Sequence, residues 1–169
     1  NKHTFHFFHY TTHNAFLPYQ LPKRLYPKFY IIFSNLLQKF SNLFYSFCST
    51  SYVKLQDAYV SEAGNQIGDW TKIGYKMANT SVFTYSEPTS GFNNNTVALS
   101  SGMEDAWVAT SLAALNDCGL GSTWAISVEQ NGSTGGSAVY VAEVTAASGS
   151  TEADCKALTP SFEKLDTKP

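Results

Sequence analysis

The residue types that most often carry out chemistry in proteins are few in this chain and lie far apart. All four histidines fall within the first 13 residues, where His6, His9 and His13 would share one face of a helix. Imidazoles at this spacing can hold a transition metal, but no thiol or carboxylate lies close in the sequence to complete the ligand set. We therefore expect no metal site and no cofactor.

Candidate nucleophiles lack the partners that would activate them. No serine stands in a Gly-x-Ser-x-Gly turn, and Cys48 has no His–Asp pair beside it in the sequence. The glycine-rich run 132–136 has neither the lysine nor the following helix of a phosphate-binding loop, which favours a hairpin turn. We expect that the chain is not an enzyme and has no catalytic or cofactor-binding residues.

Acidic and aromatic residues could instead serve binding. Glu104 with Asp105, and Glu152 with Asp154, could hold calcium in a surface loop, although such acids more often form a solvated surface. Five aromatic residues could offer flat rings on which sugars stack, or could belong to the core. These residues are Trp70, Trp107, Trp124, Tyr75 and Tyr85.

Cys118 and Cys155 enclose a stretch that is typical of one β-hairpin. Residues 124–129 and 138–145 are rich in β-branched and aromatic side chains, and the run 130–137 between them supplies turn-forming residues. A disulfide between the two cysteines would stabilise the fold by roughly 4 kcal/mol, because it restricts the unfolded chain. We predict that Cys118 and Cys155 are bonded, that Cys48 is not, and that the compartment is oxidising.

A helix and several strands are expected to position these residues. The spacing of Tyr52, Leu55 and Tyr59 predicts a helix over 52–63 that ends at Gly64, with Gln56 among the residues facing water. We expect Leu55 and Tyr59 to pack on a sheet face made by Ile126, Val128, Val139 and Val141. Further strands are predicted over 81–85 and 95–100, and helix-like spacing predicts a helix over 104–115.

The composition changes near Tyr52. Residues 1–52 carry five of the eleven Lys and Arg residues and none of the thirteen acids, so their net charge is +5 and that of the remainder is −7. The first glycine is Gly64, which is late for a folded domain. We therefore predict an aromatic, basic segment over 1–51 and a globular head over 52–169. The chain has no overall basic excess that would indicate nucleic-acid binding.

The first segment carries no obvious membrane span. Pro18, Pro22 and Pro27 interrupt any helix in its first half. The apolar run that follows them is shorter than the roughly 20 residues that a span requires. Apolar residues at intervals of three and four instead predict an amphipathic helix over 29–47.

The head resembles that of bacterial type IV pilins and type II secretion pseudopilins. The resemblance rests on the helix ending at 52–64, the segment 67–75 that begins Ile-Gly-Asp-Trp, the stretch 115–118 before Cys118, and residues 154–162 with Cys155 and Leu-Thr-Pro-Ser-Phe. It implies an α+β fold, in which an N-terminal helical segment leads into an antiparallel β-sheet head with a C-terminal disulfide-bonded loop. It also implies that the protein is a structural subunit of an extracellular filament at the cell surface. Its partners would be copies of itself, and it would lie in the inner membrane before assembly.

Residues 1–51 depart from the pilin pattern, because they lack the glycine–phenylalanine processing point and the glutamate that follows it. Three explanations stay open: a divergent helix of a fibre-forming protein, a reading frame that is not the natural one, and an unrelated fusion. The alternative function is a secreted carbohydrate-binding or adhesion module, whose partner would be a polysaccharide or a host surface.

Overall fold

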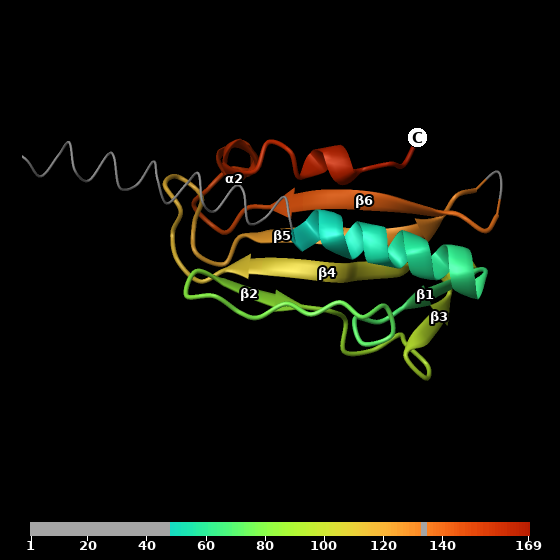
Figure 1. Cartoon of the computed structure of the whole chain (residues 1–169). Coiled ribbons are helices and arrows are strands. Elements are labelled where there is room, and N and C mark those ends of the chain that lie inside the picture. Colours follow the sequence, from blue (N-terminus) through green and yellow to red (C-terminus); the bar gives the residue numbers. More distant parts are fainter. Residues whose placement is uncertain (1–47, 133–134) are drawn as a thin grey trace, which may run out of the picture. The chain divides into compact units, whose positions relative to one another are not determined.

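The computed structural model describes residues 48–132 and 135–169 (Figure 1). The predicted helix over 29–47 and the four histidines lie outside these residues. The fold is α+β, as expected: a helix over residues 48–63, two antiparallel sheets, and a short helix α2 (Glu152–Leu158). The described helix already includes residues 48–51, so the predicted boundary near Tyr52 falls inside a helix.

The larger sheet has four antiparallel strands in the order β2-β4-β5-β6. They are β2 (Phe83–Ser86), β4 (Met103–Ser111), β5 (Thr123–Gln130) and β6 (Ala138–Thr145). The hairpin predicted between the two cysteines is confirmed as β5 and β6. A smaller sheet pairs β1 (Gln66–Gly68) with β3 (Thr96–Ala98), and the predicted strand over 95–100 ends early because η1 (Leu99–Ser101) is a 3-10 turn.

The helix predicted over 104–115 is wrong, because most of that stretch is strand β4. Trp107, Ala109 and Ser111 are buried while the residues between them are partly exposed, which is the two-residue period of a strand. β4 lies inside the sheet and pairs with β2 on one side and β5 on the other. This pairing with distant segments outweighs the helix-like spacing of the apolar residues.

The helix over 48–63 runs along the larger sheet, and the side predicted to face the sheet is buried only in part (Figure 1). Its buried residues are Cys48, Ser49, Tyr52, Gln56 and Val60, whereas Leu55 is 37% exposed. Tyr59 is partly buried against the core. The prediction placed Gln56 in water, yet its side-chain amide pairs with the backbone of Gly68 in β1, donating to the carbonyl at 3.0 Å and accepting from the N–H at 3.1 Å. A glutamine therefore occupies a core position that the apolar pattern could not reveal.

The sheet face that meets the helix was predicted correctly for β5 and wrongly for β6. Ile126 and Val128 are fully buried and pair with Ala142 and Tyr140. Cross-strand partners share a face, so Tyr140 and Ala142 point toward the helix. Val139 and Val141 pair with Glu129 and Ser127 and thus lie on the opposite face. The Tyr140 hydroxyl donates to Asp57 at 2.7 Å, which joins β6 to the helix.

Part of each outer edge of the larger sheet is hydrogen-bonded to residues outside the sheet. Along β2, the N–H groups of Phe83 and Tyr85 donate to the side chains of Thr80 (2.9 Å) and Asn79 (2.8 Å). Along β6, the N–H of Tyr140 donates to the Thr167 hydroxyl at 2.9 Å, and its carbonyl accepts from the Thr167 N–H at 3.0 Å. α2 and the 3-10 turn η2 (Glu163–Leu165) also lie against β6.

The predicted disulfide is confirmed: Cys118 and Cys155 are bonded, and Cys48 is a buried free thiol. The bond joins the loop between β4 and β5 to α2. That helix begins with a capping box, in which Thr151 and Asp154 each bond the other's backbone N–H. The indole N–H of Trp124 donates to the Thr159 hydroxyl at 2.8 Å and fixes the segment after α2 on the core.

Candidate functional site

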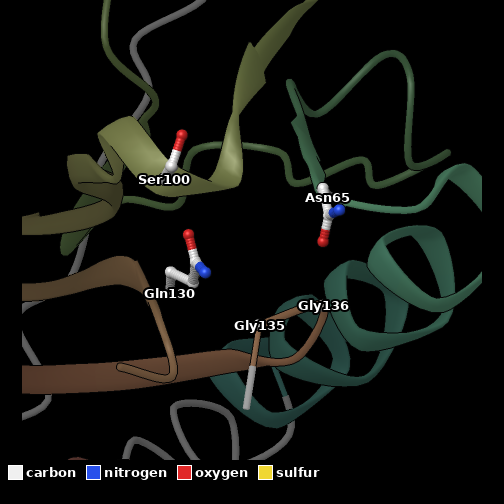
Figure 2. Close-up of a pocket in the computed structure, with 5 residues that line it drawn as sticks. All are labelled: Asn65, Ser100, Gln130, Gly135 and Gly136. Atoms are coloured by element: carbon white, nitrogen blue, oxygen red, sulfur yellow. The ribbon is translucent and has the colours of Figure 1, made fainter. Parts of the chain in front are cut away.

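The candidate site is a hollow of about 440 Å³ where three parts of the fold meet. Asn65 follows the 48–63 helix, Ser100 lies in η1, and Gln130 ends β5. Gly135 and Gly136, in the turn that leads to β6, complete the lining (Figure 2). The hollow thus joins the end of the helix to the tip of the β5–β6 hairpin.

Left-handed backbone conformations shape this hollow. Asn65, Gly135 and Gly136 have φ angles of 64°, 56° and 79°, which glycine and asparagine adopt more readily than other residues. The carbonyl of Asn65 accepts the N–H of Leu99 at 2.9 Å, which ties η1 to the end of the helix. A Cβ atom on Gly136 would lie 3.4 Å from Asn65 Oδ1, and one on Gly135 would lie 3.5 Å from Gln130 Nε2.

The lining is polar and uncharged. In Figure 2 the Asn65 side chain points toward Gly136, and the Gln130 side chain extends toward Ser100. Within the described residues, neither side-chain amide makes a hydrogen bond, so both keep their donors and acceptors for a ligand or for water. None of the five lining residues titrates. This arrangement can bind a polar molecule, and no acid or base in the lining would activate the Ser100 hydroxyl.

Cys48 is a poor nucleophile in this structure. Its side chain is buried on the 48–63 helix, and burial raises the pKa of the thiol. The Tyr75 hydroxyl donates to the Cys48 carbonyl at 3.3 Å, a contact that holds the backbone and not the sulfur. Cys48 therefore belongs to the core of the head.

The aromatic residues that could have formed a sugar-stacking platform lie in the core instead. Trp107 and Trp124 are fully buried, and Tyr75 and Tyr85 are nearly so. The indole N–H of Trp107 donates to the Tyr75 hydroxyl at 2.9 Å, and that of Trp70 donates to the Ala106 carbonyl at 3.0 Å. Burial raises the pKa of Tyr75 to about 12. Of the two alternatives for these residues, the structure favours the core, against which Trp70 is packed while partly buried.

Two of the four acidic side chains considered for calcium, those of Glu152 and Asp154, have structural roles. Asp154 bonds Thr151 in the capping box, which holds the pKa of its carboxyl below the usual value. Glu152 pairs with Lys156 at 3.2 Å. The N–H of Asp105 donates to the Ser127 hydroxyl at 3.0 Å, where β4 shifts register. Among residues 48–132 and 135–169, no three His, Cys, Asp or Glu side chains are grouped to hold a metal ion.

The sequence predicted both turns that line the hollow, but it did not predict that the two turns lie next to each other in the fold. Gly64 with Asn65 was predicted to end the helix, and the glycine-rich run was predicted to be the hairpin tip. Which turns meet is decided by the register of β5 with β6 and by the pairing of β1 with β3. No local signal in the sequence carries this information.

Comparison with protein-family models, with curated proteins and with solved structures finds no match to this chain. In the part of the chain that the structure describes, no helix is both long enough and apolar enough to cross a membrane.

Proposed function

We propose that this protein is a structural subunit of an extracellular, type IV pilin-like filament. The observation that carries the proposal is the arrangement of the head, in which a helix packs along a four-stranded antiparallel sheet and a disulfide fixes the C-terminal loop. The role of the filament would be adhesion, motility or surface attachment. This role would arise from polymerisation of the subunit and not from catalytic turnover.

The disulfide supports an extracellular location. Stable disulfides are typical of secreted proteins and are rare in the cytosol. Cys118 and Cys155 are both fully buried, and the Cys155 sulfur lies 3.4 Å from the Ser122 hydroxyl, so the bond is part of the core. A head stabilised in this way suits a subunit that works outside the cell.

The sequence upstream of the head supports assembly with further copies. The apolar positions over 29–47 recur at helical spacing and would form a stripe larger than a soluble monomer usually leaves in water. Burial of such a stripe against neighbours related by a non-closing rotation produces a helical filament. The partners would be copies of the same chain, with residues 1–47 inside and the acidic heads outside.

Deletion of residues 1–47 tests the proposal. The cut precedes Cys48 because Cys48, Ser49 and Tyr52 are buried in the head. We expect the full-length chain to form fibres and the shortened chain to stay monomeric, as seen by electron microscopy and sedimentation. A monomeric full-length chain, or a shortened chain that still polymerises, would refute the filament and favour a secreted binding module.

A further inference from the structure

We propose that the hollow formed by Asn65, Ser100, Gln130, Gly135 and Gly136 binds a neutral sugar unit of a glycan. The inference rests on the extracellular location given in the proposed function, and it does not depend on polymerisation. A sugar site would give the head a ligand of its own, whereas the proposed filament specifies only where the head is located.

The hydrogen-bonding groups of the hollow match those of a sugar. The side-chain amides of Asn65 and Gln130 each present donors and an acceptor, and the Ser100 hydroxyl presents both. Sugar hydroxyls likewise donate and accept, so neighbouring hydroxyls on one ring can bond an amide in both directions. Both amides are unengaged within the described residues, so a ligand would break no hydrogen bond between these amides and the described part of the chain.

The absence of charge in the lining selects against ionic ligands. An anion or cation that entered the hollow would lose hydration without gaining an opposite charge from any of the five lining residues. A neutral polar ligand loses less hydration free energy than an ion does. Hydrogen bonds to the two side-chain amides and to the glycine backbone would replace those that it makes with water. The volume of about 440 Å³ lies in the range of about 300–1,000 Å³ that is usual for small-molecule sites.

The backbone holds the site in place before any ligand arrives. Asn65 is fixed by its bond to Leu99, and Gln130 is fixed by the pairing of β5 with β6. The missing side chains at Gly135 and Gly136 leave room beside the two amides. Because no lining residue is aromatic, stacking does not contribute, and we expect a dissociation constant on the order of 1 mM.

Saturation-transfer NMR on the full chain tests the proposal, since it observes the ligand and works on monomers and filaments alike. The probes are the methyl glycosides of glucose, galactose, mannose and N-acetylglucosamine, with glucuronate as a charged comparison. We expect saturation transfer to at least one neutral glycoside and less than one fifth of that signal for glucuronate.

Two variants locate the binding, and a third is their matched control. Asn65→Gly keeps the left-handed backbone and removes the amide, and Gln130→Ala removes the second amide. Asn94→Gly makes the same change at another exposed asparagine of positive φ, outside the hollow. We expect at least a fivefold loss of signal in each of the first two variants and no change in the third.

Three results would overturn the sugar site: no transfer to any neutral glycoside, equal transfer to glucuronate, or undiminished transfer in Asn65→Gly. Asn65→Gly is decisive if Gln130→Ala fails to fold, because glycine accepts the backbone angle of Asn65. Electron microscopy of the same samples reports on fibres separately, so failure of the sugar site is distinguishable from failure of the filament.

Discussion

At the scale of single residues, Gln56 shows how a polar side chain can take part in a core. It is fully buried, one turn of helix from Tyr52 and from Val60, and its amide satisfies both backbone groups of Gly68. A buried amide is tolerated only when its hydrogen bonds are made. The contact therefore specifies where β1 lies against the helix as well as adding stability.

Replacing Gln56 with alanine should destabilise the head by about 1–3 kcal/mol, because the N–H and carbonyl of Gly68 lose their partner away from water. Leu55→Ala is the matched control on the same helix. Since Leu55 is 37% exposed, its replacement should change stability by only about 0.5 kcal/mol. Urea unfolding of both variants measures the difference, and a larger loss in Leu55→Ala would show that the other side of the helix is the buried one.

At the scale of elements, the disulfide determines how firmly α2 is held. α2 has only seven residues and is too short to be stable by itself. Its connection to the loop after β4 through Cys118 and Cys155 confines it to the sheet, with Trp124 and Thr159 as a second attachment.

The double variant Cys118→Ala with Cys155→Ala should lose about 2–4 kcal/mol of stability, because the unfolded chain is no longer cross-linked. Cys48→Ala serves as the control, because it removes a thiol without changing any cross-link. Thermal unfolding without reducing agent compares the two, and equal melting temperatures for the double variant and the parent protein would contradict a stabilising role for the bond.

Elements with strong local patterns could be predicted from the sequence, and those decided by distant contacts could not. The hairpin strands β5 and β6 carry dense β-branched residues between clear turn formers, so both were found. The apolar residues of β4 have a spacing that fits neither a helix nor a strand alone, and pairing with β2 and β5 decides that the segment is a strand. The cross-strand register decides which residues of β6 face the helix. The sequence of β6 does not reveal this register, because β6 has apolar residues on both faces.

For the candidate site too, features with a local pattern could be predicted from the sequence, and those formed by distant contacts could not. The disulfide could be predicted because two cysteines bracket one hairpin. The hollow could not, because Asn65, Ser100 and Gln130 are ordinary polar residues that become neighbours only after the two sheets form. The aromatic residues left two alternatives open, because tryptophan and tyrosine occur both in cores and on binding surfaces.

At the scale of the whole molecule, the buried tyrosines make stability depend on alkaline pH. Burial raises the pKa of Tyr75 to about 12, and it also raises the pKa of Tyr52, Tyr85 and Tyr140. A raised pKa in the folded state means that the unfolded state releases its proton first. Stability is therefore complete below about pH 10, the usual pKa of tyrosine, and falls as the pH rises toward 12.

We expect ionisation of these tyrosines and unfolding to occur together. Ultraviolet absorbance of tyrosinate and far-ultraviolet circular dichroism, followed from pH 9 to 12.5, should show Tyr52, Tyr75, Tyr85 and Tyr140 ionising only as secondary structure is lost. Ionisation of all tyrosines near pH 10 with the fold intact would contradict the burial of this group.

The hydrogen-bonded parts of the outer edges of the larger sheet limit how copies of this protein can associate. The side chains of Thr80 and Asn79 accept the N–H groups of Phe83 and Tyr85 in β2, and Thr167 bonds the N–H and the carbonyl of Tyr140 in β6. A strand from another chain would have to displace these side chains before it could add to the sheet. A fibre of this protein would then be a string of intact folded units and not a cross-β aggregate, and its dissociation would return each head to solution already folded.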